Sequence, residues 1–232
     1  MHDYIFNVVT YNRVQLATES IMKLVMQKPS NSIVDVIDDC SKESLFELEY
    51  LLNEPLSNHF PKNQLRQNKV RLGVELNNIN RLNDSIYDNQ EFVYLTDNDV
   101  CYSRLFYIQL EKLKNLMIED KSIFASTLFN YNIVGSCHPE IGNYNEDYVL
   151  KNSFGGVSML IRVEDFKKAM EYYQSPNYRY VKGWDWAVCH YGISVENKKL
   201  VATKNSYVQH VGIEGENSTK ERYDYANNFI KK

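Results

Sequence analysis

Short apolar, β-branched runs alternate along the chain with longer stretches in which apolar residues recur at helical spacing. The first pattern predicts strands and the second predicts helices. The expected strands cover residues 4–10, 32–37, 91–96, 123–129, 157–161 and 200–211. The expected helices follow the first strand as far as Pro29, carry Leu45, Leu48, Leu51 and Leu52, and cover residues 70–82, 105–118, 164–173 and 187–191.

This alternation is typical of an α/β fold with a mostly parallel central sheet flanked by helices. No internal repeat or low-complexity linker divides the chain, so we expect a single domain over residues 1–232. Two polar segments interrupt the pattern. Residues 136–152 are expected to form a mobile loop, and the chain after Gly212 is expected to be a flexible tail. Both are candidate lids over a binding site.

Polar clusters stand where three successive expected strands end. The first is Thr10-Tyr11-Asn12-Arg13, the second is Asp38-Asp39, and the third is Asp97-Asn98-Asp99. In open parallel sheets, ligands bind at the carboxyl ends of the strands. The sequence therefore predicts one ligand site built from these three clusters.

Composition and charge exclude several classes of protein. The net charge is −4, with Lys and Arg spread along the chain, so nothing suggests a basic face for nucleic acid. The N-terminus does not resemble a signal peptide, and no run approaches the roughly 18 apolar residues of a membrane span. The four cysteines match no zinc or redox spacing. We therefore expect a cytoplasmic protein with reduced thiols and no transmembrane segment.

The sharpest motif is the pair of carboxylates in Asp97-Asn98-Asp99. Two acids two residues apart in a strand-end turn can converge on one divalent cation and its bound phosphate oxygens. The alternative is an ordinary turn, because Asp and Asn favour turns. The preceding strand, residues 92–96, favours the metal site.

These motifs together resemble the GT-A glycosyltransferases. Residues 92–99 (FVYLTDND) are similar to the D-x-D region of that group, residues 7–13 (NVVTYNR) to its first strand, and residues 36–41 (VIDDCS) to its second strand end. The helix around residues 71–80 stands in the expected order. The resemblance implies a GT-A, Rossmann-like fold whose nucleotide-binding half is residues 1–100 and whose acceptor half is residues 101–232. It also implies Mn²⁺ or Mg²⁺ as cofactor, a UDP-sugar donor, and a glycan or other hydroxyl acceptor.

The resemblance also assigns residues to the donor. Thr10 and Tyr11 would flank the base, Asp38 or Asp39 would hold the base or ribose, and Asp99 would ligate the metal. Asp97 would reach the ribose or donor sugar beside the metal. The remaining expected donor-binding residues are Arg13, Asn98 and Arg71, and the alternative for Arg71 is a solvated helix position.

In the second half, two segments carry the expected acceptor chemistry. Gly155 and Gly156 resemble the segment that faces the donor sugar and acceptor, although a plain turn is the alternative. The segment from Gly183 to Trp186 resembles the one that carries the catalytic base of inverting enzymes. Asp185 would take the proton of the attacking hydroxyl. Its alternative role is to cap the following helix, and Trp184 stands where the family often has a second acid.

His210 is the expected last ligand of the metal. It follows the final predicted strand, as a metal-binding histidine does in several GT-A families, and imidazole can join carboxylates on Mn²⁺. The other histidines, His138 among them, have no such context and are predicted to be structural. Lys220 and Arg222 in the tail either close over the diphosphate or are solvated.

The sequence therefore predicts a metal-dependent, inverting glycosyltransferase. A retaining enzyme on the same fold is the first alternative, because Asp185 would then only cap a helix. A nucleotidyltransferase would need a Gly-rich, basic loop after its first strand, and Thr10-Tyr11-Asn12-Arg13 is not one. A non-catalytic carbohydrate-binding domain would have no use for three polar clusters at successive strand ends.

Overall fold

The computed structural model describes residues 3–53, 63–88, 90–131, 137–176, 178, 183–212 and 225–231. Its helices are α1 (Val14–Gln27), α2 (Phe46–Asn53), α3 (Val74–Arg81), α4 (Phe106–Glu119), α5 (Val163–Gln174) and α6 (Trp184–His190). A short 3₁₀ turn (Ser85–Tyr87) precedes β4, and a π-helical turn (Tyr191–Val195) extends α6. The strands are β1 (Ile5–Thr10), β2 (Ile33–Asp38), β3 (Gln64–Gln67), β4 (Phe92–Asp97), β5 (Val100–Tyr102), β6 (Ile123–Thr127), β7 (Glu140–Asn143), β8 (Tyr148–Lys151), β9 (Ser158–Arg162), β10 (Lys199–Thr203) and β11 (Val208–His210).

Within the described ranges, nine strands form one sheet in the order β3-β2-β1-β4-β9-β6-β10-β8-β7. The first four strands of this order are mutually parallel. Beyond β4 the pairs are mixed: β9 runs antiparallel to β4 and β6, β6 and β10 are parallel, and β8 runs antiparallel to β10 and β7. The α/β fold is confirmed, and the sheet is parallel in its N-terminal half and mixed in its C-terminal half.

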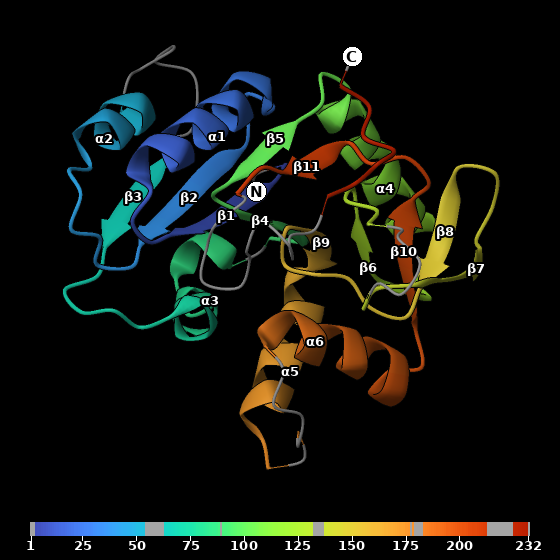
Figure 1. The fold of residues 1–232 in the computed structure, drawn as a ribbon. Helices are drawn as coiled ribbons and strands as arrows, with labels where there is room; N and C mark the ends of the chain where they lie inside the picture. The colour runs from blue at the N-terminus through green and yellow to red at the C-terminus, as the bar shows by residue number, and fades with distance from the viewer. Residues whose placement is uncertain are drawn as a thin grey trace.

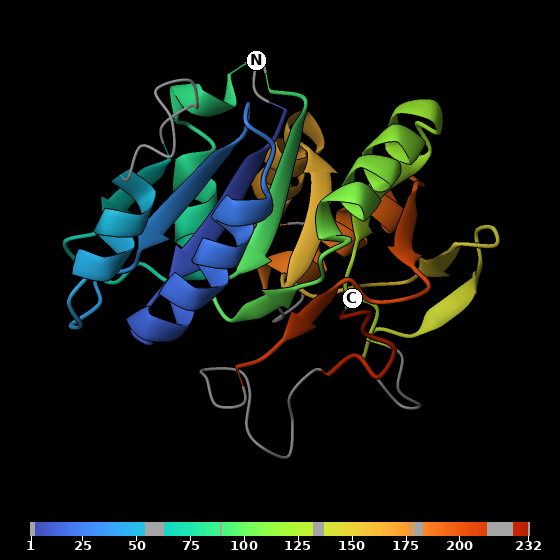
Figure 2. The same cartoon turned by 90° about the horizontal axis from the view of Figure 1, so that it is seen from above.

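Helices cover both faces of the sheet (Figures 1 and 2). The helices α1, α2 and α4 pack on one face, and α5 and α6 pack on the other, with α3 on their side of the sheet. Successive strand residues point to opposite faces, so Phe6 and Val8 belong to the first core and Ile5 to the second. Burial of both faces explains why the strands read as nearly continuous apolar runs.

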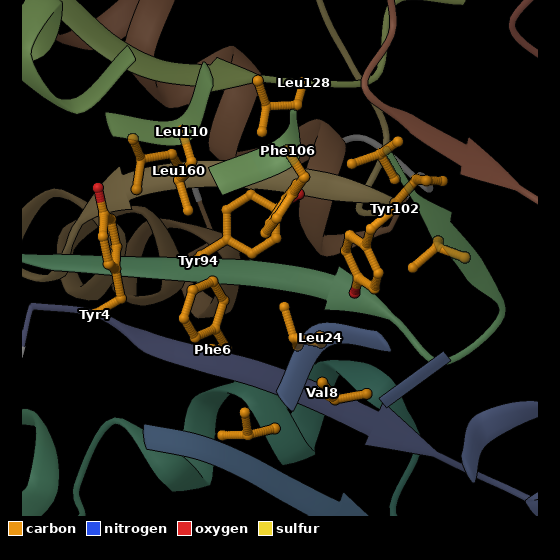
Figure 3. Close-up of a cluster of buried hydrophobic side chains, with 14 of the residues drawn as sticks. Tyr4, Phe6, Val8, Leu24, Tyr94, Tyr102, Phe106, Leu110, Leu128 and Leu160 are labelled. Carbon is orange, nitrogen blue, oxygen red and sulfur yellow. The ribbon is translucent and has the colours of Figure 1, made fainter. Parts of the chain in front are cut away.

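The core under α1 and α4 is rich in aromatic rings (Figure 3). Phe106 of α4 lies edge-on to Tyr94 of β4, with ring centroids 5.4 Å apart, and to Tyr102 of β5, with centroids 4.7 Å apart. The Tyr102 hydroxyl lies 3.1 Å from the Thr96 hydroxyl, so its polar end is satisfied. These contacts fix the segment between β4 and β5, which carries Asp97, Asn98 and Asp99.

The structure corrects the expectation that residues 136–152 form a mobile loop. Residue 136 lies outside the described residues, but residues 137–152 contain the hairpin β7–β8 at the edge of the sheet. Asn145 forms the turn, because its side-chain oxygen accepts hydrogen bonds from the amides of Asp147 and Tyr148. The residues of the edge strand β7 are mostly exposed and show little alternation of apolar and polar side chains. The sequence pattern therefore did not predict a strand here. This segment is not a mobile loop.

The expected last strand, residues 200–211, is two strands in two sheets. β10 joins the large sheet, and β11 pairs antiparallel with β5 in a second, two-stranded sheet. The tail expected to be flexible is anchored over residues 225–231: the Ala226 amide donates to the Gln209 side chain, and the Ile230 amide donates to the Ser206 carbonyl. The segment 213–224, with Lys220 and Arg222, lies outside the described residues.

Two further features bear on the predictions. All four cysteines lie in the described ranges and none forms a disulfide. No helix of the described chain has the length and apolar character needed to cross a membrane.

Candidate active site

The carboxyl ends of β1, β2 and β4 lie side by side, because β1 is parallel to both neighbours. Thr10 is in register with Asp38 across the β1–β2 pair. At the other side of β1, the Asn98 side-chain amide donates to the Thr10 hydroxyl at 2.9 Å. The three polar clusters predicted from the sequence therefore meet at one edge of the sheet.

Asp38 and Asp39 are both buried, and both already accept hydrogen bonds from protein groups. Asp38 accepts from the Ser41 amide at 2.9 Å and from the Ser41 hydroxyl. Asp39 accepts from the amides of Leu72 and Gly73, each at 2.8 Å. Burial opposes the ionisation of Asp39, but these amide bonds hold its pKa below the usual range. Both acids therefore shape the loops around the site.

Arg71 is exposed to solvent, but it lies in a loop and not in a helix. Helix α3 begins only at Val74, after Gly73 with a φ of 85°, so residues 70–73 of the expected helix form the loop tied to Asp39. From this loop the Arg71 guanidinium lies 4.1 Å from the centroid of the Tyr11 ring. The sequence analysis expects Tyr11 and Arg71 to bind the donor separately. In the structure the two side chains are in contact with one another.

Arg13 lies at the start of α1 in the left-handed region, with a φ of 53°. The carboxylate of Glu43 accepts hydrogen bonds from the amides of Arg13 and Val14, at 2.8 and 2.7 Å, and so caps the helix. The Arg13 side chain turns toward the β4–β5 turn, where its Nη1 lies 3.0 Å from Asp99 Oδ2. Arg13 thus joins the acidic cluster.

Asp97, Asp99 and His210 form a compact group. Each offers one ligand atom, and these atoms lie within 4.8 Å of one another. Antiparallel pairing of β11 with β5 delivers His210 opposite Val100. His210 Nε2 lies 3.1 Å from Asp99 Oδ1. Two carboxylates and one imidazole are a donor set that suits Mn²⁺.

The charges in this group influence one another. Burial and the adjacent charge of Asp99 raise the pKa of Asp97 to about 7. Burial opposes the ionisation of Asp99, but the hydrogen bond and charge of His210, together with Arg13, hold its pKa below the usual range. A divalent cation between these groups would relieve the crowding of the two carboxylates.

Gly212 shows that the space beside Asp99 is narrow. A Cβ at Gly212 would stand 1.9 Å from Asp99 Oδ2 and 3.0 Å from Arg13 Nη1. Any larger residue would therefore displace the Asp99 carboxylate. The chain just after His210 thus fits closely around the acidic group, which is the geometry required to hold a small ion.

Asp185 lies in the first turn of α6, two residues after the N-cap Gly183. Its Oδ1 accepts a hydrogen bond from the Trp186 amide at 2.9 Å, which is partial capping of its own helix. Burial raises the pKa of Asp185 to about 6, against hydrogen bonds from the amides of Trp186 and Gly156. The charge of Asp185 also raises the pKa of Asp97, so the two acids are close enough to interact.

The paired glycines have different surroundings. A Cβ at Gly156 would stand 2.6 Å from the Trp184 ring, so this glycine lets the indole pack against the β8–β9 connection. A Cβ at Gly155 would make only ordinary contacts, 3.7 Å from Asp185 Oδ2 and 3.7 Å from His138 Nε2. Gly155 therefore lies between two side chains that carry proton chemistry.

His138 was predicted to be structural, and it lies near Gly155, 3.7 Å from the position of a Cβ there. It is buried, its Nδ1 lies 2.9 Å from the Ser153 hydroxyl, and its ring lies 5.0 Å from the Trp186 ring. His138 lies between β6 and β7 in a stretch with no regular pattern, so no periodicity in the sequence indicates where its side chain points.

The structure is similar to solved glycosyltransferases. GalNAc-T7 with UDP, GalNAc and Mn²⁺ superposes with a TM-score of 0.65 at 13% identity, over 89% of this chain and 42% of that one. The mannosyltransferase PcManGT from Pyrobaculum calidifontis, in complex with GDP-Man and Mn²⁺, gives 0.59 at 15% identity, over 88% and 58%. S. aureus TarS 1–349 gives 0.58 at 16% identity, over 92% and 61%.

No family model matches the sequence, and no curated protein matches it. The chain spans about two to three fifths of the length of the solved structures above. The likeness is one of fold: the chain has the GT-A fold of these nucleotide-sugar glycosyltransferases.

Proposed function

Because the chain has the GT-A fold and carries Asp97, Asp99 and His210 at the edge where its parallel strands end, we propose that it is a metal-dependent glycosyltransferase. It transfers a sugar from a UDP-sugar to a hydroxyl of a glycan or similar acceptor. The observation that carries the proposal is the convergence of the three ligand atoms within 4.8 Å from two segments that are distant in the sequence.

The donor nucleotide binds over the ends of β1 and β2. The stacked pair of Arg71 and Tyr11 offers a flat cationic surface to the base. Asp38 and Asp39 hold the surrounding loops, and their remaining oxygen lone pairs face the base or ribose. Thr10 and Asn98, joined by a hydrogen bond, form the base of this nucleotide site.

The diphosphate binds at the acidic cluster. Asp99, His210 and Asp97 hold Mn²⁺ or Mg²⁺, which neutralises the leaving diphosphate when it is bound. Arg13 then contributes in a different way from the metal ligands. Its guanidinium pairs with Asp99 at 3.0 Å. When the metal takes over the charge of Asp99, the guanidinium donates two parallel hydrogen bonds to oxygens of the diphosphate.

On the acceptor side, Asp185 takes the proton of the attacking hydroxyl. A carboxylate with a pKa of about 6 is ionised at neutral pH and more basic than an exposed one, which suits a general base. The backbone at Gly155 and Gly156 faces the donor sugar. Attack by a hydroxyl that Asp185 activates, opposite the leaving diphosphate, inverts the anomeric carbon.

Retention is the second candidate, and one observation favours it. Asp185 accepts a hydrogen bond from the Trp186 amide in its own helix, as a capping residue does. NMR of the first-formed product separates the two candidates, because inversion and retention give opposite anomers from one donor.

The absence of disulfides among the four cysteines accords with a reducing compartment such as the cytoplasm.

The test is calorimetric binding of UDP and GDP, each with Mn²⁺ and with EDTA, to the wild type, Asp99→Asn and Asp147→Asn. Asp147 is an exposed acid in the β7–β8 turn and serves as the matched control. We expect UDP to bind with Mn²⁺ and not with EDTA, and Asp99→Asn to lose this binding while Asp147→Asn keeps it. Absence of nucleotide binding under every metal condition would refute the proposal.

A further inference from the structure

The carboxylates of Glu75 and Asp185 lie close together between the starts of two helices. Glu75 is in the first turn of α3 and Asp185 is in the first turn of α6, and both helices lie on the same side of the sheet (Figure 1). Asp185 Oδ1 and Glu75 Oε1 lie 3.1 Å and 3.6 Å from the position of a Cβ on Gly183, the N-cap of α6. Glu75 Oε2 lies 3.6 Å from the position of a Cβ on Gly73, the N-cap of α3. Two negative groups from segments distant in the sequence are therefore neighbours across Gly183.

The Glu75 carboxylate has no cationic partner in the part of the chain that the structure describes. Within those residues, no hydrogen bond or ion pair joins its oxygens to a donor, although the side chain is half-buried. Burial raises the pKa of Asp185 to about 6, and the charge of Glu75 acts in the same direction. Two like charges placed in this way repel one another and oppose folding. An unfavourable arrangement of this kind is typical of a functional site.

Three of the other groups that face Asp185 carry no charge at neutral pH. Burial raises the pKa of Tyr173 at the end of α5, and it raises the pKa of Tyr178, which follows that helix, to about 12. Burial also raises the pKa of the Cys189 thiol within α6. Both phenols and the thiol therefore stay protonated, and none of them adds a negative charge beside Asp185.

Two further groups complete the described surroundings of Asp185. Asp97, at the end of β4, belongs to the candidate metal group, so a bound cation offsets its charge. His138 Nε2 and Asp185 Oδ2 each lie 3.7 Å from the position of a Cβ on Gly155, and an imidazole adds no negative charge. Among the described residues, Glu75 is thus the anionic neighbour whose charge persists when the metal site is filled.

We propose that Glu75 is a positioning residue for the proton chemistry of Asp185: its charge, held across Gly183, makes the Asp185 carboxylate a stronger base. This inference rests on the proposed function. The proton of the acceptor hydroxyl passes to an Asp185 oxygen as the acceptor oxygen bonds to the anomeric carbon and the diphosphate leaves. Glu75 exchanges no proton. A like charge nearby disfavours the ionised carboxylate, so Asp185 holds the incoming proton more tightly.

Three substitutions separate this role from a purely structural one. Glu75→Gln removes the charge and keeps the size of the side chain, whereas Glu75→Asp keeps the charge. Glu164→Gln is the matched control, because Glu164 is an exposed glutamate in the first turn of α5. It removes the same favourable contact between an acid and a helix N-terminus. If Glu75 only stabilises α3, both glutamine variants change stability and neither changes the dependence of activity on pH.

The kinetic readout is the pH profile of kcat, measured as UDP release from UDP-hexoses with methyl glycosides as acceptors. For Glu75→Gln we expect the acid limb to move about half a pH unit lower, because one charge screened by nearby water is removed. The plateau should fall about twofold, because a weaker base takes the proton less readily. The variant is then more active than the wild type at pH 5 and less active at pH 8.

The controls make the result specific to the charge. Glu75→Asp is expected to keep the acid limb close to that of the wild type, and Glu164→Gln is expected to leave the whole profile unchanged. An unshifted acid limb in Glu75→Gln, whether its activity is normal or reduced at every pH, would overturn the proposal. An equal shift in Glu164→Gln would overturn it as well, because the effect would then not depend on the position of Glu75.

Carbon NMR tests the same claim without substrate. The carboxyl signal of Asp185, assigned with Asp185→Asn in aspartate-labelled protein, is followed against pH with Mg²⁺ present. We expect it to titrate about half a unit lower in Glu75→Gln than in the wild type. Equal titration in the two proteins contradicts the inference. Failure of the proposed function is recognised separately, since the wild type would then bind no nucleotide, whatever the titration of Asp185 shows.

Discussion

The two halves of the sheet build their parts of the site in different ways. In the N-terminal half, parallel strands β2, β1 and β4 end at one edge, and each strand end supplies polar residues directly. In the C-terminal half, parallel and antiparallel pairs are mixed, and the candidate side chains come from a connection before β7, a connection before β9 and the first turn of α6. A parallel sheet gathers side chains by topology alone, whereas a mixed sheet needs each loop to be placed individually.

The halves also differ in how burial is used. The donor-side acids Asp38 and Asp39 are buried among hydrogen-bond donors, which stabilise the charged carboxylate. Asp185 is half-buried, and for this carboxylate the desolvation outweighs its backbone hydrogen bonds, so its pKa is raised to about 6. The first arrangement produces rigid anchors, and the second produces a group that can exchange a proton near neutral pH.

The largest expected effect separates chemistry in one half from binding in the other. Asp185→Asn removes the base and should lower the rate of transfer by about 10³-fold. Binding of UDP with Mn²⁺ should stay within about twofold, because the residues proposed to bind the nucleotide and the metal lie at the ends of β1, β2 and β4 and on β11, not on α6. Steady-state transfer assays and calorimetry on the same preparation test this, with Asp147→Asn as the control. Equal loss of donor binding would show that the halves are not separable.

The next effect tests the point where the halves join. In Gly212→Ala the new methyl group collides with Asp99, so we expect the affinity for Mn²⁺ to fall about 10- to 100-fold. Gly142→Ala is the matched control, because a Cβ at Gly142 has nothing within 4 Å. Titration of Mn²⁺ in the presence of UDP measures both. Unchanged affinity in Gly212→Ala would mean that Asp99 does not ligate the metal.

The pH dependence of transfer sharpens the contrast in burial. Asp185 must be ionised to act as a base, so activity is lost as the pH falls through its pKa of about 6. At saturating metal and donor, kcat should fall about tenfold between pH 7 and pH 5. The residual activity of Asp185→Asn should lack this step. A step that persists in that variant would assign the titration to another group.

The smallest expected effect lies wholly in the N-terminal half. Arg71→Ala removes the guanidinium from the Tyr11 ring, a contact worth about 0.5–1 kcal/mol. The dissociation constant of UDP should rise about two- to fivefold, without any change in the ratio of transfer to hydrolysis. Calorimetry and product analysis measure the two quantities. A change in that ratio would show that the pair also influences the acceptor side.

The sequence predicts the N-terminal half well, for a physical reason. Parallel strands buried on both faces give uninterrupted apolar runs, so β1, β2 and β4 are recognised, and the polar residues after them fall at one edge. The grouping of His210 with Asp97 and Asp99 was expected from the resemblance to GT-A glycosyltransferases and not from this reasoning. The strand pattern does not anticipate that Asp39 holds the Arg71 loop, because those backbone hydrogen bonds depend on a turn with no regular pattern.

The C-terminal half resists prediction because its signals are local or hidden. The exposed edge strand β7 has little apolar alternation, so the β7–β8 hairpin resembles a loop. The change of sheet between β10 and β11 occurs within one apolar stretch, and hydropathy does not show it. His138 lies outside any regular element, so the sequence pattern does not show that it packs on Ser153 and Trp186.

The pairing of β11 with β5 has a consequence for how the protein is made. Synthesis proceeds from the N-terminus, and domains fold as their residues emerge. Asp97 and Asp99 are translated before His210, which follows only after β6 to β10. A nascent chain that stops before residue 210 therefore has the parallel strands β1, β2 and β4 without the complete group of Asp97, Asp99 and His210. We expect such a chain to lack the proposed metal site.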